Sequence, residues 1–192
     1  MARDAVPLRE PRFARWLFTS TAAAWIWLAA RLYFGWGWLS AGWDKLNDPR
    51  WMSGGYALQE FAQRASTEMT QGERPAVAYG WYGDFLRWVA SDGYPSVAKV
   101  VAIAETTIGI LLIVGMFTGI AAFAGGALTM SLGLAGTAGV NPVFFLFEVL
   151  CVLAWRNAGY IGLDRWALPA LGTPWAPGRV IKGARGSNRR IA

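Results

Sequence analysis

The first long apolar stretch of the chain, residues 18–43, reads FTSTAAAWIWLAARLYFGWGWLSAGW and carries one charged side chain, Arg31. A bilayer core takes about 20 mainly apolar helical residues, so this stretch is long enough to cross a membrane. Because Arg31 interrupts it, we expect a retained helix and not a cleaved signal peptide. Three further apolar stretches lie at residues 96–118, 120–138 and 142–158. Together they predict an all-α membrane protein with four transmembrane helices in a bundle.

The composition of the chain also favours a membrane protein. Of its 192 residues, 55% are hydrophobic and only 16% are charged. Soluble domains carry roughly 25% charged residues, so a surface facing water is hard to build from this sequence. The chain has 12 Trp, 10 Phe and 6 Tyr, and such residues are typical of membrane interfaces. We therefore expect lipid to be the principal partner of this chain.

The residue types that are missing exclude several kinds of chemistry. The chain has no histidine, which excludes imidazole ligation of zinc or haem and a Ser-His-Asp triad. Its one cysteine, Cys151, allows no internal disulfide and no iron–sulfur cluster. The net charge of +6 comes from cations concentrated at the two ends of the chain, as beside anionic headgroups. We therefore predict no metal site and no nucleic-acid binding.

The distribution of cations predicts the orientation of the four spans. Residues 1–17 and 159–192 are both basic, and an even number of spans places both tails on one side. Since basic tails stay in the cytoplasm, we predict both termini inside, with the connection 44–95 outside. Residues 178–192 are basic and rich in glycine, which predicts a disordered tail.

The external connection contains two amphipathic patterns. Apolar residues recur at helical spacing over Tyr56–Met69 and again over Ala78–Ala90. We predict two short helices that lie on the outer membrane surface or fold over the bundle as a cap. An outer aromatic belt is predicted from six tryptophans: Trp36, Trp38, Trp43, Trp51, Trp81 and Trp88.

Small residues indicate how the spans meet. Gly115 and Gly119 form one GxxxG pattern, and further glycines follow through residues 125–139. Because such residues let helix backbones approach closely, the span at 120–138 is expected to pack inside the bundle or against a partner. We expect either a partner subunit or a homo-oligomer.

Three charged residues lie well inside the predicted spans, away from their ends, where each costs at least about 2.5–3.5 kcal/mol. They are Arg31, Glu105 and Glu148, and counting from the outer ends places them in overlapping layers. If Arg31 pairs with Glu105, the other carboxylate lacks a full partner and holds a proton near neutral pH. Such a group suits proton handling in a redox or transport step. The alternative is a buried pair that only sets the helix register.

Lys45 follows the tryptophan-rich end of the first span. It is expected at the outer mouth of the bundle, where a small oxyanion would first meet the protein. We therefore predict Arg31 and Lys45 as substrate-binding residues and Glu105 and Glu148 as catalytic proton carriers. The alternative for Lys45 is an ordinary anchor at the membrane surface.

The segment RLYFGWGWLSAGWDKL, residues 31–46, resembles the first helix of the DoxX/DoxD family, with Arg31, Gly35, Gly42 and Lys45 at the matching positions. Glu105, Gly109, Gly115 and Gly119 resemble the second helix of that family, and residues 159–169 resemble an extension seen in some members. The resemblance implies a small integral protein of the prokaryotic plasma membrane. Some members resemble the membrane subunit of a thiosulfate:quinone oxidoreductase, and the long external connection is similar to the DoxD type.

Three functions remain open at this point. The chain could couple thiosulfate or another external donor to membrane quinone, with quinone as substrate and no covalently bound cofactor. It has no flavin motif or cysteine pair to relay electrons, so the donor would have to react directly with quinone or on a partner subunit. Alternatively, the chain is a non-catalytic anchor or assembly subunit for a partner redox protein. The third alternative is a small transporter.

Overall fold

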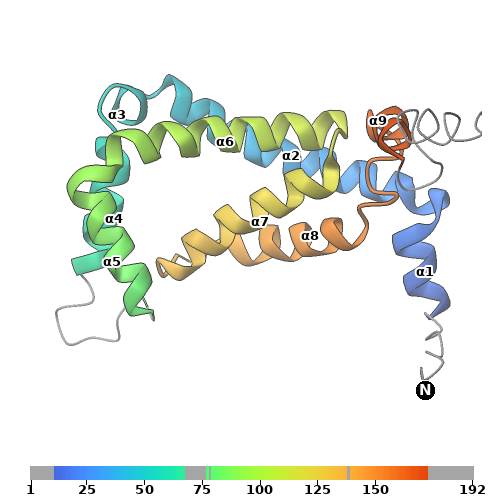
Figure 1. The fold of residues 1–192 in the computed structure, drawn as a ribbon, viewed down its shortest axis with the longest axis horizontal. Helices are drawn as coiled ribbons and strands as arrows, with labels where there is room; N and C mark the ends of the chain where they lie inside the picture. The colour runs from blue at the N-terminus through green and yellow to red at the C-terminus, as the bar shows by residue number, and fades with distance from the viewer. Residues whose placement is uncertain (1–10, 68–76, 78, 138, 173–192) are drawn as a thin grey trace, which may run out of the picture.

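The structure is a computed structural model that describes residues 11–67, 77, 79–137 and 139–172. These residues form helices and no strand, so the predicted all-α class is confirmed. The helices make two antiparallel pairs with shorter helices at both ends (Figure 1). The first pair holds Arg31, Lys45 and Glu105, three of the residues that the sequence singled out.

Helix α2 (Ala24–Asn47) lies along α6 (Tyr94–Val114), and this is the most extensive contact between two helices (Figure 1). The two backbones touch at glycines. A Cβ atom added at Gly109 would lie 2.6 Å from Leu39 Cα, and one at Gly42 would lie 2.9 Å from Thr106 Cα. No side chain larger than hydrogen fits at either position, so the two glycines set the register of the pair.

The second pair consists of α7 (Thr118–Leu134) and α8 (Asn141–Leu153), and it packs across the first. Aromatic side chains join the two layers, because the Phe34 ring of α2 stacks on Phe147 of α8 with 4.1 Å between ring centroids. Ile108 and Leu112 of α6 belong to the same buried cluster. The core therefore lies between the pairs, as the bundle prediction requires.

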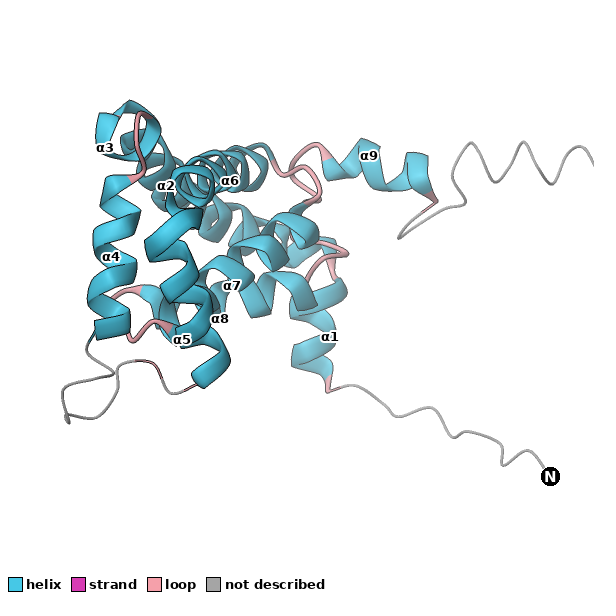
Figure 2. Cartoon of the chain, turned by 60° about the vertical axis from the view of Figure 1, so that its left-hand side comes forward, coloured by secondary structure: helices cyan, strands magenta, loops and turns pink. Residues whose placement is uncertain are grey.

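The connection after α2 forms a cap on one end of the pairs. It contains α3 (Pro49–Met52), α4 (Tyr56–Thr67) and α5 (Gly80–Trp88), and a π-helical turn at Val89–Gly93 joins α5 to α6. Figure 2 shows α4 and α5 side by side at this end of the molecule. The Tyr82 hydroxyl donates to the Ser131 carbonyl at 2.6 Å, which ties the cap to the end of α7.

Both amphipathic helices predicted in this connection therefore form. We considered that these helices either lie on the membrane surface or fold over the bundle. They fold over its end as a cap with its own buried cluster, which includes Ala62, Leu86 and Ala135. Met69 and Ala78 lie outside the described residues.

The other end of the bundle holds α1 (Arg12–Thr19), a short 3-10 helix (Thr21–Ala23) and α9 (Asp164–Leu171). Residues 159–172, the first part of the predicted basic tail, fold back onto the bundle. The Leu163 N–H donates to the Val114 carbonyl at 3.1 Å and the Asp164 N–H donates to Gly115 at 2.8 Å. The chain folds back because the C-terminal end of α6 offers open carbonyls. Residues 1–10 and 173–192, including the tail predicted to be disordered, lie outside the described residues.

Asp164 explains the turn between α6 and α7. Its carboxylate accepts the N–H of Phe117 at 2.6 Å and that of Thr118 at 3.0 Å, so it caps α7 from a distant part of the chain. Gly115 ends α6 with a φ of +68°, a left-handed conformation that glycine adopts without strain. The turn spans residues 115–117, so the turn predicted at Thr118–Gly119 is placed two to three residues too late in the chain.

The four predicted spans correspond to α2, α6, α7 and α8 with shifted ends. Among the described residues, one continuous helical stretch, Gly80–Val114, is long and apolar enough to cross a membrane by length and composition. Helices α7 and α8 are apolar but shorter. A multi-pass arrangement stays a prediction.

The glycine contact between α2 and α6 yields a test. We expect Gly109→Ala to destabilise the fold by about 1–3 kcal/mol, because the added methyl overlaps the α2 backbone. Gly133→Ala is the control, since Gly133 is an exposed helical glycine whose Cβ would meet nothing within 4 Å. That control should be neutral or stabilising by up to about 1 kcal/mol. Thermal unfolding in detergent, followed by circular dichroism, measures both; equal melting temperatures would contradict the glycine contact.

Candidate functional site

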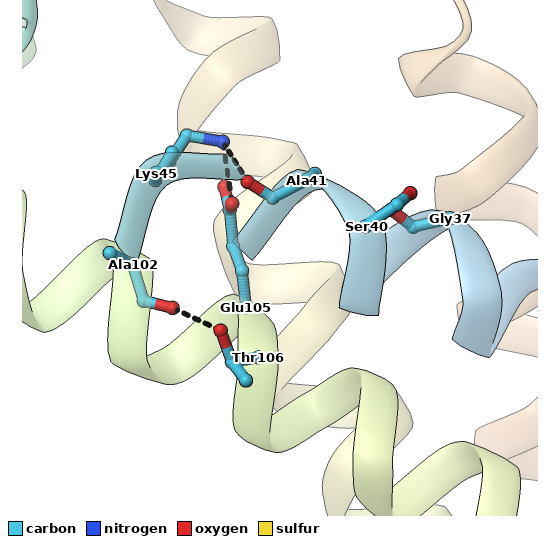
Figure 3. A network of polar contacts seen from close by, with 7 residues as sticks. All are labelled: Gly37, Ser40, Ala41, Lys45, Ala102, Glu105 and Thr106. Atoms are coloured by element: carbon cyan, nitrogen blue, oxygen red, sulfur yellow. Dashed lines mark hydrogen bonds and ion pairs between the residues drawn. The ribbon is translucent and has the colours of Figure 1, made fainter. Parts of the chain in front are cut away.

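An ion pair between a partly buried lysine and a buried glutamate connects α2 to α6 near the cap. Lys45 Nζ lies 2.5 Å from Glu105 Oε2, and the side chains are 22% and 6% exposed, respectively. Figure 3 shows the lysine folding over toward Glu105, close to the carbonyl of Ala41. The same ammonium lies 5.1 Å from the ring centroid of Trp51. Carboxylate, carbonyl and aromatic face together compensate much of the cost of removing this cation from water.

The position of the pair follows from the close contact of the two helices. Gly42 and Thr106 lie directly against each other; Lys45 follows Gly42 by about one turn, and Glu105 directly precedes Thr106. The side chain of Lys45 folds back along α2, where its ammonium donates to the Ala41 carbonyl. From there it reaches Glu105 across the contact between the two helices.

A second polar cluster surrounds Glu148 of α8. Its side chain is buried, and its Oε1 accepts the indole N–H of Trp38 at 3.0 Å and the hydroxyl of Thr129 at 3.2 Å. Glu148 Oε2 is buried and has no hydrogen-bond partner among the described residues. Gly125 of α7 leaves room for this carboxyl group, because a Cβ there would lie 2.8 Å from Oε1.

The two clusters border one pocket of about 200 Å³. Lys45 and Glu105 lie on its wall, and so do Trp38 and Thr129, the two residues that hold Glu148. Phe144 and Asn141 of α8 contribute to the same wall. The pocket thus combines one cation, one carboxylate and one hydroxyl with apolar surface, which is the usual make-up of a small-molecule site.

Arg31 lies elsewhere, and the prediction that it shares a layer with Glu105 and Glu148 is wrong. It is fully buried, with Nη1 donating to the Leu112 carbonyl at 2.6 Å and Nη2 donating to Ile161 at 2.8 Å. Arg31 lies 14 residues from Lys45, or about 21 Å along α2.

The pairing of Arg31 with Glu105, which the sequence left open, does not form. Arg31 faces the last turn of α6, where the missing side chain of Gly115 makes room for the guanidinium. Lys45 takes its place beside Glu105. The depths counted from the outer ends of the spans placed Arg31 wrongly, because that count ignores the register of the two helices.

Trp38 is a functional candidate that the sequence analysis placed in the aromatic belt. It is 5% exposed and binds Glu148, whereas Trp36 and Trp43 of the same helix are exposed, as expected for a belt. A signal was present in the sequence, because Arg31, Gly35, Trp38, Gly42 and Lys45 are spaced by four, three, four and three residues. That spacing puts all five residues on one face of α2. No spacing in the sequence singled out Thr129 in this way.

In the part of the chain that the structure describes, no three His, Cys, Asp or Glu side chains come together as a group that could hold a metal ion. Cys151 is buried in the core, as expected for a lone cysteine of an apolar helix.

The ion pair yields a double-mutant test. Lys45→Met and Glu105→Leu should each destabilise the fold by about 3 kcal/mol, because each leaves a buried group without its partner. The double variant should recover most of that loss. The exposed pair Arg50–Glu60 is the control and should couple by less than about 1 kcal/mol. Chemical unfolding in detergent measures all variants; additive losses at Lys45 and Glu105 would contradict a coupled pair.

In comparisons with known proteins, no family model, no curated protein and no solved structure matches this chain. The resemblance to the DoxX/DoxD family stays a prediction that depends on the residues quoted for it.

Proposed function

We propose that the chain is a multi-pass membrane protein in which α2, α6, α7 and α8 cross the bilayer. The support is the distribution of side chains between the outer surface and the interior. Large apolar residues on all four helices are exposed, among them Trp36, Ile103, Phe123 and Leu146. Soluble monomers rarely expose apolar surface on this scale.

The interior supports the same proposal, because it holds the charges. Arg31, Glu105 and Glu148 are all buried and satisfied mainly by the protein itself. A bundle with apolar residues outside and ionisable residues inside suits a hydrocarbon solvent. Helix α8 is short for a span, and the turns at residues 154–163 would extend it toward the membrane surface.

The proposed membrane is the plasma membrane of a prokaryote, with the cap outside and both termini in the cytoplasm. Four arginines lie at or beside the helices of the end away from the cap: Arg12, Arg15, Arg156 and Arg165. Basic residues at this end are what the positive-inside rule expects of a cytoplasmic face.

We infer that the chain serves a redox system of this membrane and binds a quinone ring in the pocket beside Lys45. A quinone becomes a quinol by taking up two electrons and two protons. Lys45 would donate a hydrogen bond to a ring carbonyl, and Glu105 would exchange a proton with it. The observation that carries the proposal is that the Lys45–Glu105 pair lies on the wall of a pocket while remaining inside the bundle.

Glu148 would serve as the second proton carrier. Thr129 borders the pocket and donates to Glu148, so its hydroxyl connects the two. The electrons would come from thiosulfate or another external donor, either directly or through a partner subunit. The pocket volume of about 200 Å³ suits a single ring, and an isoprenoid tail would lie along the apolar outer surface.

One observation favours the alternative of a docking subunit for a partner redox protein. Aromatic side chains form an exposed row along α5, consisting of Trp81, Phe85 and Trp88. Aromatic residues are enriched where proteins bind one another. A partner on this row would sit on the same side as the pocket.

The redox proposal is tested with Glu105→Gln. Reconstituted protein is supplied with thiosulfate and a short-chain quinone, and quinol formation is measured. We expect the variant to lose activity by at least about 100-fold, because the amide cannot exchange a proton. Glu60→Gln, an exposed glutamate of the cap, should keep full activity.

Assembly is measured on the same samples by size-exclusion chromatography. Loss of quinol formation with intact assembly supports proton handling by Glu105. Loss of assembly, or unchanged activity of Glu105→Gln, would contradict it and favour a structural pair. If wild-type protein forms no quinol and retains no quinone, the docking and transport alternatives are favoured instead.

The proposed topology is tested with single cysteines in a Cys151→Ser background. Arg64→Cys of the cap should react with an impermeant maleimide added to intact cells. Arg165→Cys of α9 should react only after the membrane is permeabilised. Labelling of both positions in intact cells would contradict the proposed orientation.

A further inference from the structure

A larger pocket lies at the opposite end of the bundle from Lys45. Its volume is about 460 Å³, and it is lined by residues from the first turns of α7, the end of α8 and helix α9. Ile120, Phe123, Val152 and Leu168 contribute apolar walls. None of the predicted site residues lines this pocket, so it is separate from the proposed quinone site.

The polar groups beside this pocket are not open to a ligand. Thr118 is fully buried, so its hydroxyl is covered by the protein. The neighbouring Asp164 carboxylate accepts the N–H groups of Phe117 and Thr118. The pocket therefore offers mainly apolar walls and fits a long apolar group.

One arginine gives the surroundings of the pocket a positive charge. Arg156 directly follows the lining residue Trp155, and its guanidinium lies 5.7 Å from the centroid of the Trp155 ring. Arg165 belongs to a different pocket, which it lines together with Tyr160, and its guanidinium lies 5.5 Å from the centroid of the Tyr160 ring. Arg156 is exposed and forms no ion pair with any residue that the structure describes. It is therefore open to a phosphate, to which guanidinium groups bind well.

The geometry points to a binding site for one anionic phospholipid. An acyl chain occupies the pocket, and the phosphate lies beside Arg156. This inference rests on the membrane embedding proposed above but not on quinone chemistry. An anionic lipid is favoured over a quinone because a neutral quinone has no charge to complement the exposed guanidinium of Arg156. It is favoured over a zwitterionic lipid because a net negative headgroup complements the charge of the rim.

The site is tested by native mass spectrometry of the full chain in mild detergent. Phosphatidylglycerol and phosphatidylcholine with identical acyl chains are added at equal concentration. We expect wild-type protein to retain phosphatidylglycerol preferentially. Arg156→Gln should weaken that binding about fivefold, the effect of one basic residue beside a headgroup, and leave phosphatidylcholine binding unchanged. Arg64→Gln, which removes an exposed cation from the cap, should match wild type.

A second pair of variants tests the pocket itself. Leu168→Trp fills it and should remove the retained lipid, while Ala170→Trp adds the same ring to an exposed position of α9 outside the lining. Both variants are first shown to unfold at the wild-type temperature. Equal retention of the two lipids by wild type, or equal effects of the two tryptophan variants, would overturn the proposal. So would extraction of a quinone that Leu168→Trp displaces.

Failure of the lipid site can be distinguished from failure of the proposed function. Extraction of membranes at alkaline pH tests embedding, and quinol formation by Glu105→Gln tests the quinone site. A chain that stays in the membrane pellet but shows no preference for phosphatidylglycerol overturns the lipid site alone.

Discussion

The contact between α2 and α6 is the constraint on which the other features of this structure depend. Gly42 and Gly109 bring the two backbones together, so the side chains on the facing surfaces have one possible register. That register places Lys45 beside Glu105 and carries Arg31 to the last turn of α6. A shift of one helical turn would separate both charges from their partners.

Each buried charge is satisfied in a different way, and the difference separates structural from functional candidates. Arg31 donates to two carbonyls from distant segments, which ties the end of α6 to the chain that follows α8. Two of the three guanidinium nitrogens of Arg31 thus have hydrogen-bond partners without a ligand; Nε has none among the described residues. Lys45 and Glu105 instead border a pocket, where a bound molecule can reach them. The pair near the cap is therefore the better candidate for chemistry, and Arg31 for stability.

The two ends of the bundle have opposite characters. The cap closes one end with its own buried cluster and lies next to the pocket that contains the ion pair. At the other end, α9 lines an apolar pocket near the exposed Arg156. A small charged pocket and a larger apolar pocket suit different ligands, which is why we propose the quinone ring at one end and the lipid chain at the other.

Hydropathy and periodicity in the sequence determined the helical class, the approximate positions of the long helices and the two helices of the cap. These features depend on neighbours in sequence, where a repeat of 3.6 residues is visible. The high cost of burying a charge also pointed to Arg31, Glu105 and Glu148 before any contact was known. Only the tertiary structure decided the partners. Lys45 with Glu105, Trp38 with Glu148 and Asp164 with the start of α7 are all contacts between distant segments. They depend on how closely two helices approach and in which register, and hydropathy and spacing along a single helix carry no information about either.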